Sequence, residues 1–337
     1  MTKSFDLELP VIRPRRMRQA GWMRDLVAEH TLLPHQLIQP IFVRDESTEA
    51  VIPSMDGVLR LLLNELPKYV EECLSLGIKA VALFPCVDGV LKTPNADQAF
   101  SPDNLICKSL RLLKKTFKND IGLITDVALD PYTSHGQDGL MVGEHVHNDE
   151  TLAALCMQAL VQSEAGADIV APSDMMDGRV YAIRSALDQH NFQNVSIMSY
   201  GAKYASSFYG PFRDALNNKS VVNRDLKKTY QMNPKNSKEA LREMTLDVEE
   251  GADMIIVKPG LPYLDIVHMA AQTFDIPIFA YHVSGEYAML KAASLNGWLD
   301  YDQTLIETLN CFIRAGATGV LTYGARDAAK LLKGTHP

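Results

Sequence analysis

One arrangement of polar and apolar residues returns four times along the chain. A stretch with helical spacing of its apolar positions ends at a small turn around glycine, and a short apolar run follows at once. Glycine at the C-terminal end of a helix takes the left-handed backbone conformation at little cost. The apolar runs do not alternate with polar residues, which is typical of strands buried on both faces of a parallel sheet. The four copies are LGIKAVALFP, AGADIVAPSD, EGADMIIVKPG and AGATGVLTYG.

Eight such runs can be counted, and most are separated by stretches with helical periodicity. One of these stretches places apolar side chains on one face at Leu152, Leu155, Cys156 and Leu160. Alternating strands and helices predict an α/β fold, and eight strands predict a closed (β/α)8 barrel, or TIM barrel. The alternative is a doubly wound sheet, but the Gly-rich phosphate loop usual in that fold is missing. The runs are 37–43, 80–85, 122–127, 168–173, 196–201, 254–259, 276–282 and 319–324.

Two segments do not fit a minimal barrel. Residues 1–33 are predicted to form an extended N-terminal arm with a short helix at 23–30, and they hold too few apolar residues for a core. We expect this arm to pack on another subunit. The predicted barrel domain is 34–337, and its long insertion at about 204–240 is expected to be an active-site lid.

Composition argues against several kinds of partner. The 337 residues are 47% hydrophobic and 22% charged, with a net charge of −8, which is typical of a globular protein. Such acidity argues against nucleic acid and anionic membranes as partners. No apolar run approaches a membrane span, and the N-terminus has no apolar stretch of a secretory signal. Five scattered cysteines without a CxxC pair predict reduced thiols and a cytoplasmic location.

Candidate chemistry lies where the predicted strands end, because barrel enzymes build their sites there. Lys258 follows an apolar run, and partial desolvation lowers the pKa of such a lysine. Its neutral amine can form a Schiff base with a carbonyl. Lys203 ends the preceding run, and neighbouring strands lie about 5 Å apart, so that repulsion lowers at least one pKa further. The pair is more specific than either lysine, since a single strand-end lysine more often reaches solvent or pairs with a carboxylate.

Basic, hydroxyl and carboxylate groups accompany the two lysines. They suit a substrate with a carboxylate as well as a carbonyl, although a surface position for Arg213 is an equal alternative on sequence alone. The strand-end and lid candidates are Asp126, Ser173, Arg213, Lys227, Gln231, Ser284 and Tyr323.

The stretch DVALDPYTSHGQDG crowds three aspartates, Asp126, Asp130 and Asp138, and the imidazole of His135 into a short loop. These groups suit Mg²⁺, Mn²⁺ or Zn²⁺, and a carboxylate near a lysine also suits acid/base chemistry. The same residue types make ordinary polar turns. Spacing alone leaves a metal site, an acid/base site and a polar turn open. The stretch GEHVHNDE is interpreted as a solvated loop.

Longer motifs resemble one known family. They are APSDMMDGR (171–179), YGAKYASSFYGPFRDA (200–215), KKTYQM (227–232), MIIVKPGLPYLD (254–265) and VSGEY (283–287). These motifs, and nearly the whole chain, are similar to the δ-aminolevulinate dehydratases, or porphobilinogen synthases. The resemblance implies a (β/α)8 barrel whose arm wraps a neighbouring subunit, usually in an octamer. It also implies condensation of two molecules of 5-aminolevulinate to porphobilinogen, the pyrrole precursor of tetrapyrroles such as haem, with loss of two waters.

The resemblance implies roles for individual residues. Lys258 would hold the first substrate as a Schiff base, and Lys203 would bind the second. The groups that would hold carboxylates are Ser284 and Tyr323 for the first substrate, and Arg213, Lys227 and Gln231 for the second. Asp126 and Ser173 would line the pocket and help to place an amino group.

The resemblance also carries expectations about metals. Many relatives bind a catalytic zinc through cysteines at the positions of Ala128, Asp130 and Asp138, where this chain has no sulfur. It resembles the zinc-independent branch, in which an activating Mg²⁺ lies away from the active site, bound mainly through water and one glutamate. The matching residue is Glu243, which by itself would be interpreted as a solvated helical carboxylate. We therefore expect allosteric Mg²⁺, no catalytic zinc, and a weak cation or an acid/base role at Asp130 and Asp138.

Two other functions stay open on the sequence. A class I aldolase is also a barrel with a Schiff-base lysine, but it would leave Lys203 and the second carboxylate-binding group without a role. A barrel kept for assembly or binding alone would show damage at the strand-end residues, and the sequence shows none.

Overall fold

The computed structural model of the chain describes residues 11–216 and 224–334, so residues 217–223 of the expected lid lie outside it. The chain divides into two units between Thr31 and Leu32. The first contains the 3-10 helix η1 (Pro14–Arg18) and the helix α1 (Gly21–Leu26), neither of which has a buried side chain. The helix expected at 23–30 therefore begins and ends earlier. The exposure of both helices agrees with a segment that has no core of its own.

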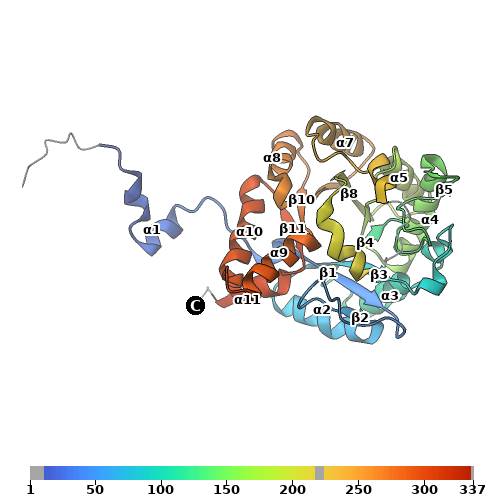
Figure 1. Ribbon diagram of the computed structural model, residues 1–337, viewed down its shortest axis with the longest axis horizontal. Helices are drawn as coiled ribbons and strands as arrows, with labels where there is room; N and C mark the ends of the chain where they lie inside the picture. The colour runs from blue at the N-terminus through green and yellow to red at the C-terminus, as the bar shows by residue number, and fades with distance from the viewer. Residues whose placement is uncertain (1–10, 217–223, 335–337) are drawn as a thin grey trace, which may run out of the picture. The chain divides into compact units, whose positions relative to one another are not determined.

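The second unit is a closed barrel of parallel strands surrounded by helices (Figure 1). All eight predicted strands are present, and pairing of β11 with β1 closes the sheet, so the doubly wound alternative is wrong. The short strand β2 (Arg60–Leu62) pairs with β1, and β5 (Met141–Val142) pairs with β6 (His145–Val146). The barrel strands are β1 Leu37–Arg44, β3 Ala80–Cys86, β4 Gly122–Val127, β7 Ile169–Pro172, β8 Ser196–Lys203, β9 Met254–Lys258, β10 Ile278–His282 and β11 Gly319–Thr322.

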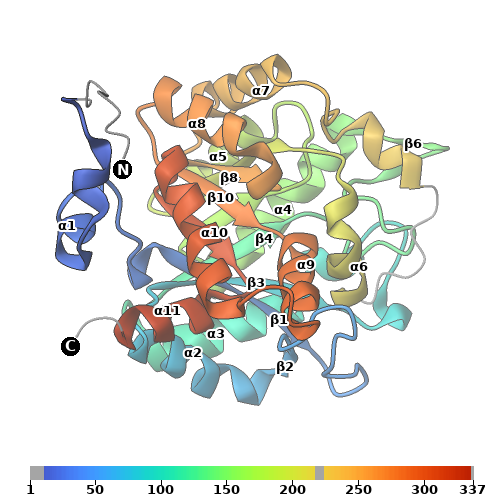
Figure 2. The ribbon, with the colours of Figure 1, turned by 60° about the vertical axis from the view of Figure 1, so that its left-hand side comes forward.

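Helices cover the outside of the barrel and its ends (Figure 2). The glycines of the four repeated phrases, Gly77, Gly166, Gly251 and Gly316, have φ between 90° and 109°, as the helix-ending turn predicts. No described helix is long and apolar enough to cross a membrane. The α-helices are α2 Leu66–Ser75, α3 Leu105–Phe117, α4 Asn148–Ala165, α5 Arg179–Gln189, α6 Gly210–Ala215, α7 Lys238–Glu249, α8 Leu264–Thr273, α9 Ser284–Leu295, α10 Tyr301–Ala315 and α11 Ala325–Gly334. The remaining 3-10 helices are η2 Pro34–Gln36, η3 Leu63–Glu65, η4 Gly89–Leu91, η5 Asp97–Phe100, η6 Ser207–Tyr209, η7 Arg224–Thr229 and η8 Leu261–Tyr263.

Alternate residues of each strand fill two separate cores. On β9, Ile256 belongs to the core inside the barrel, whereas Ile255 and Val257 pack in the core beneath the helices. Because side chains alternate along a strand, Lys258 shares the inward direction of Ile256. The last residue of β9 is thereby directed to the mouth of the barrel.

Strand β8 breaks this alternation just before its end. Tyr200 lies in the inner core, yet Ala202 lies in the outer one, because the pairing of β8 with β9 shifts between Ser199 and Ala202. Such a bulge adds one residue and reverses the direction of the side chains that follow. Lys203 consequently pairs in register with Lys258, and both lysines belong to the same mouth.

Candidate active site

Lys258 is a buried lysine inside a cage of aromatic rings. Its Nζ lies 5.0 Å from the ring centre of Tyr200, 5.4 Å from Tyr209, 4.9 Å from Phe212 and 4.7 Å from Tyr281. Burial, reinforced by the nearby charge of Lys203, lowers the pKa of Lys258 to about 7. About half of its side chains are therefore neutral nucleophiles near neutral pH.

Lys203 is held differently from Lys258. Its Nζ lies 3.0 Å from Oδ2 of Asp138 and donates to the carbonyl oxygen of Ser173. Lys227 donates to the other oxygen of Asp138, and Gln231 Nε2 lies 3.2 Å from Oδ2. The buried carboxylate of Asp138 is thus bonded to the second lysine and to two residues of the expected lid.

The three aspartates of the stretch DVALDPYTSHGQDG differ in charge state. Burial raises the pKa of Asp138, but Lys203 and Lys227 outweigh it and hold the pKa well below its usual range. Burial raises the pKa of Asp126 to about 6, against the opposing effect of Lys258. The pKa of Asp130 is raised by burial and by the charge of Asp138. A carboxyl that titrates near neutral pH and one that stays ionised therefore share the site.

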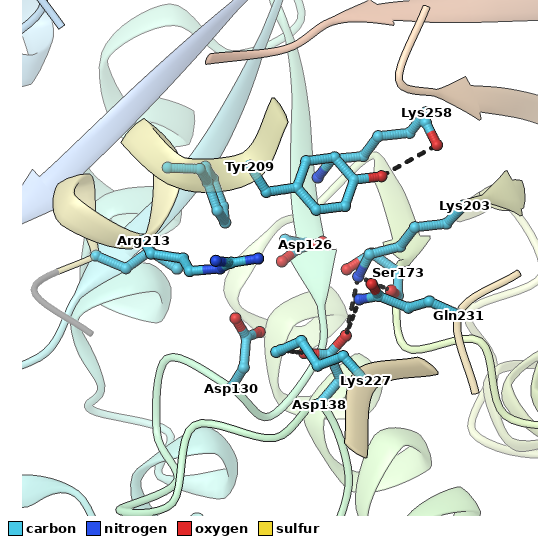
Figure 3. A pocket seen from close by; sticks show the side chains of 12 residues that line it. Asp126, Asp130, Asp138, Ser173, Lys203, Tyr209, Arg213, Lys227, Gln231 and Lys258 are labelled. Carbon is cyan, nitrogen blue, oxygen red and sulfur yellow. Dashed lines mark hydrogen bonds and ion pairs between the residues drawn. The ribbon is translucent and has the colours of Figure 1, made fainter. Parts of the chain in front are cut away.

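These groups line one pocket with about 510 Å³ of empty space. Figure 3 shows side chains from β8, β9, α6 and η7 directed toward the carboxylates of the loop after β4. Tyr209 and Phe212 were not singled out from the sequence, although both lie in the quoted motif YGAKYASSFYGPFRDA. The lining residues are Asp126, Asp130, Asp138, Ser173, Lys203, Tyr209, Phe212, Arg213, Leu216, Lys227, Gln231 and Lys258.

Ser284 and Tyr323 are not among these lining residues. The hydroxyl of Ser284, the first residue of α9, accepts from the backbone N–H of Phe212 at 2.9 Å. The hydroxyl of Tyr323 lies 3.1 Å from that of Tyr281, whose ring faces Lys258. Each residue therefore contacts a member of the aromatic cage and does not itself line the pocket.

Glu243 is a predicted site residue that lines a different cavity from the other candidates. It lines a second cavity, with about 900 Å³ of empty space, together with Asp177 and Glu239. Gln231 lines both cavities. Burial raises the pKa of Glu243, with Arg179 opposing and the neighbouring carboxylates adding to the rise.

His135 serves the loop itself. Its Nδ1 accepts from the backbone N–H of Gln137 at 3.1 Å, and its Nε2 lies 3.3 Å from the carbonyl oxygen of Pro94. The stretch GEHVHNDE forms β6 and the start of α4, where His147 Nδ1 accepts from the backbone N–H of Glu150. These contacts give both stretches a structural role.

A closed barrel that places an amine with a lowered pKa beside a second lysine has the arrangement that Schiff-base enzymes use. The family model for delta-aminolevulinic acid dehydratase matches residues 11–331. The delta-aminolevulinic acid dehydratase of Bradyrhizobium diazoefficiens is 53% identical over 96% of this chain and 91% of that protein. The chloroplastic enzyme of Chlamydomonas reinhardtii is 50% identical, over 96% of this chain and 85% of that protein.

A solved structure is similar over almost the whole chain. It is delta-aminolevulinic acid dehydratase (porphobilinogen synthase) from Toxoplasma gondii in complex with the reaction product porphobilinogen. The TM-score is 0.92 at 51% identity, over 95% of this chain and 91% of that one. The chain therefore belongs to the delta-aminolevulinic acid dehydratase family, the porphobilinogen synthases of tetrapyrrole biosynthesis. The two alternative hypotheses, a class I aldolase and a barrel kept for assembly or binding alone, are therefore wrong.

Proposed function

We propose that the chain condenses two molecules of 5-aminolevulinate to porphobilinogen and two waters, with Schiff bases on Lys258 and Lys203. The observation that carries this proposal is the amine of Lys258, with a pKa of about 7, in an aromatic cage beside Lys203. In the first step its Nζ attacks the keto carbon of one substrate. The carbonyl oxygen leaves as water, and a C=N bond replaces the C=O bond.

Asp126 is the proposed proton carrier for these steps. Its carboxyl lines the pocket, and its pKa of about 6 lies near neutrality, which suits general acid and base catalysis. Its Oδ1 is buried and has no hydrogen-bond partner among the described residues. A substrate amino group beside this oxygen would satisfy it, with Ser173 as a neighbour in the pocket.

The second substrate is proposed to bind at Lys203, with its carboxylate on Arg213, Lys227 and Gln231. Support comes from the charges of the pocket, where basic side chains converge from α6 and η7. Lys227 is paired with Asp138 at 2.5 Å. An entering carboxylate would take over Lys227, while Asp138 keeps its ion pair with Lys203.

The carboxylate of the first substrate is proposed to bind at Ser284 and Tyr323. Ser284 opens α9, a helix of 12 residues whose N-terminal N–H groups favour an anion. Both hydroxyls now bond to protein partners, Phe212 and Tyr281, so binding requires these contacts to exchange.

We propose that the enzyme belongs to the zinc-independent, magnesium-responsive branch. Asp138 fits zinc poorly, because both of its oxygens accept from lysine ammonium groups that would repel a cation. No group of three or more His, Cys, Asp or Glu in the described part is arranged to hold a metal. Glu243 fits Mg²⁺ bound through water, since its cavity is roomy and carries further carboxylates. Bound Mg²⁺ would supply positive charge to that cavity.

The proposal also covers the assembly of subunits, the closure of the active-site lid and the location of the protein in the cell. Residues 1–33 are proposed to bind a neighbouring subunit in an octamer, which the exposed helices η1 and α1 support. Residues 204–240 are proposed to close over bound substrate, since Arg213 and Lys227 both line the pocket, where a substrate carboxylate would meet them. The free thiols of all five cysteines favour a cytoplasmic location.

The test is incubation of the purified protein with 5-aminolevulinate and a colorimetric assay for the pyrrole. We expect turnover in the natural protein and none in Lys258→Ala. The matched control is Lys114→Ala, which removes a lysine paired with Asp168 at 2.6 Å on the outer side of the barrel. Absence of pyrrole from the natural protein, or persistence of turnover in Lys258→Ala, would show that the proposal is wrong.

A further inference from the structure

Strand β2 carries a buried guanidinium that joins two distant parts of the chain. Arg60 is 5% exposed. Its Nε donates to the carbonyl oxygen of Ala215 and its Nη2 to that of Asp214, both at 2.6 Å. Its Nη1 donates to the carbonyl oxygens of Glu49 at 2.9 Å and Val51 at 2.7 Å. One side chain thus ties the last two residues of α6 to the loop after β1.

The helix that Arg60 holds carries two residues of the active-site pocket. Phe212 faces Lys258 Nζ at 4.9 Å, and its ring packs against Phe42 at 5.8 Å and Phe84 at 5.6 Å. Arg213 follows it and lines the pocket. A short helix such as α6, with six residues, is not stable alone and depends on tertiary contacts.

The two ends of α6 have separate anchors. Figure 2 shows α6 beside α9, where the hydroxyl of Ser284 accepts from the N–H of Phe212 at 2.9 Å. At the other end the last carbonyl groups of a helix lack partners within the helix, and a cation is favoured there. Arg60 supplies both the donors and the cation, and Ser54 adds a hydrogen bond of 2.7 Å to the side chain of Asp214.

We propose that Arg60 is a positioning residue, which fixes α6 so that Phe212 shields Lys258 from water and Arg213 reaches the second substrate. The proposal rests on the proposed roles of Lys258 and Arg213. The planar guanidinium presents its N–H groups as a fork, which fits carbonyl oxygens on two sides. A lysine ammonium at this place keeps the charge but cannot reach all four acceptors.

The decisive variant is therefore Arg60→Lys, because it separates geometry from charge. The charged groups that face Lys258 are Lys203, Asp126, Asp130 and Asp138, and they lie on β4, in the loop after it and on β8. The titratable phenols that face it are those of Tyr200, Tyr209 and Tyr281, on β8, η6 and β10. The variant leaves all of these charges in place. A change in the titration of Lys258 must then come through α6 and its aromatic ring.

In Arg60→Lys we expect the KM for 5-aminolevulinate to rise about tenfold, as Arg213 loses its fixed place. We also expect the acid limb of the kcat/KM profile to move about one pH unit upward. Loosening of Phe212 lets water reach Lys258, which raises its pKa, so the neutral amine appears at higher pH. Arg60→Met should show both changes more strongly.

The matched control is Arg44→Met. Arg44 donates to two carbonyl groups in the same loop, those of Asp45 and Thr48, and to that of Arg60, and all three lie outside α6. The control is expected to lower the unfolding temperature while KM and the acid limb stay unchanged.

The inference is overturned if Arg60→Lys lowers only the unfolding temperature, or if Arg44→Met shifts KM and the acid limb equally. If Arg60→Met does not fold, Arg60→Lys carries the same comparison. Borohydride trapping of substrate on Lys258 in the natural protein tests the proposed function separately. A trapped adduct with unchanged kinetics in the Arg60 variants would remove this inference alone.

Discussion

Removal of the second lysine should change the titration of the first. Lys258 has a pKa of about 7 instead of 10.5, so about half of it is neutral at pH 7, against about 1 in 3,000 for an ordinary lysine. Burial is the larger cause and Lys203 the next. In Lys203→Met the like charge disappears while Asp126, Asp130 and Asp138 remain. We expect the pKa of Lys258 to rise by about 1 to 2 units.

The assay must not need turnover, because Lys203 is itself a proposed catalytic residue. Levulinate has the carbonyl and the carboxylate of the substrate but no amino group, so it can form the imine and go no further. Borohydride trapping across a pH series, followed by peptide mapping, reports the neutral fraction of Lys258. Half-maximal trapping should move from about pH 7 to about pH 8–9, because the amine must lose its proton before it attacks.

The control for this experiment is Lys114→Met, which breaks an ion pair with Asp168 away from the pocket. It should leave the trapping profile unchanged. An unchanged or lower midpoint in Lys203→Met would refute the argument that charge repulsion activates Lys258. An adduct only on other lysines would refute the assignment of the nucleophile itself.

Three further predictions concern metal, assembly and lid. Glu243→Ala should abolish activation by Mg²⁺ while basal turnover stays measurable, and 1,10-phenanthroline should leave activity intact; stoichiometric zinc whose removal abolishes activity would contradict this. Deletion of residues 1–31 should reduce the number of subunits per particle in light scattering while the barrel keeps its unfolding transition, and an unchanged number would count against a subunit contact. A bound substrate analogue should reduce proteolysis between about residues 204 and 240, whereas equal cleavage with and without the analogue would argue against lid closure.

The eight strands of the barrel could be predicted because their signal is local. Each is a short apolar run after a helix-ending glycine, and burial on both faces requires such a run. Both lysines could also be predicted as site residues, because they stand at the ends of these runs and barrel sites form at strand ends. The lid residues Arg213, Lys227 and Gln231 were chemically suggestive, but sequence alone left a surface position for Arg213 equally open.

The direction of Lys203 was decided only by the tertiary structure. Strict alternation from Tyr200 would direct Ala202 inward and Lys203 outward, and the bulge after Ser199 reverses this. A bulge depends on how β8 pairs with β9, more than fifty residues further along the chain, and no local pattern encodes it. The aromatic cage of Lys258 arises in the same way, from β8, β10, η6 and the start of α6.

In the loop DVALDPYTSHGQDG, too, some properties follow from the sequence and others only from the tertiary structure. Its composition left a metal site, an acid/base site and a polar turn open. The structure distinguishes its carboxylates, because Asp138 meets Lys203 and Lys227, 65 and 89 residues away, whereas the half-buried Asp126 lies near Lys258. The sequence by itself determined which residue types stand at the strand ends. Only the fold decided which charges face each other, because burial and electrostatic distance are properties of packed segments and not of neighbours along the chain.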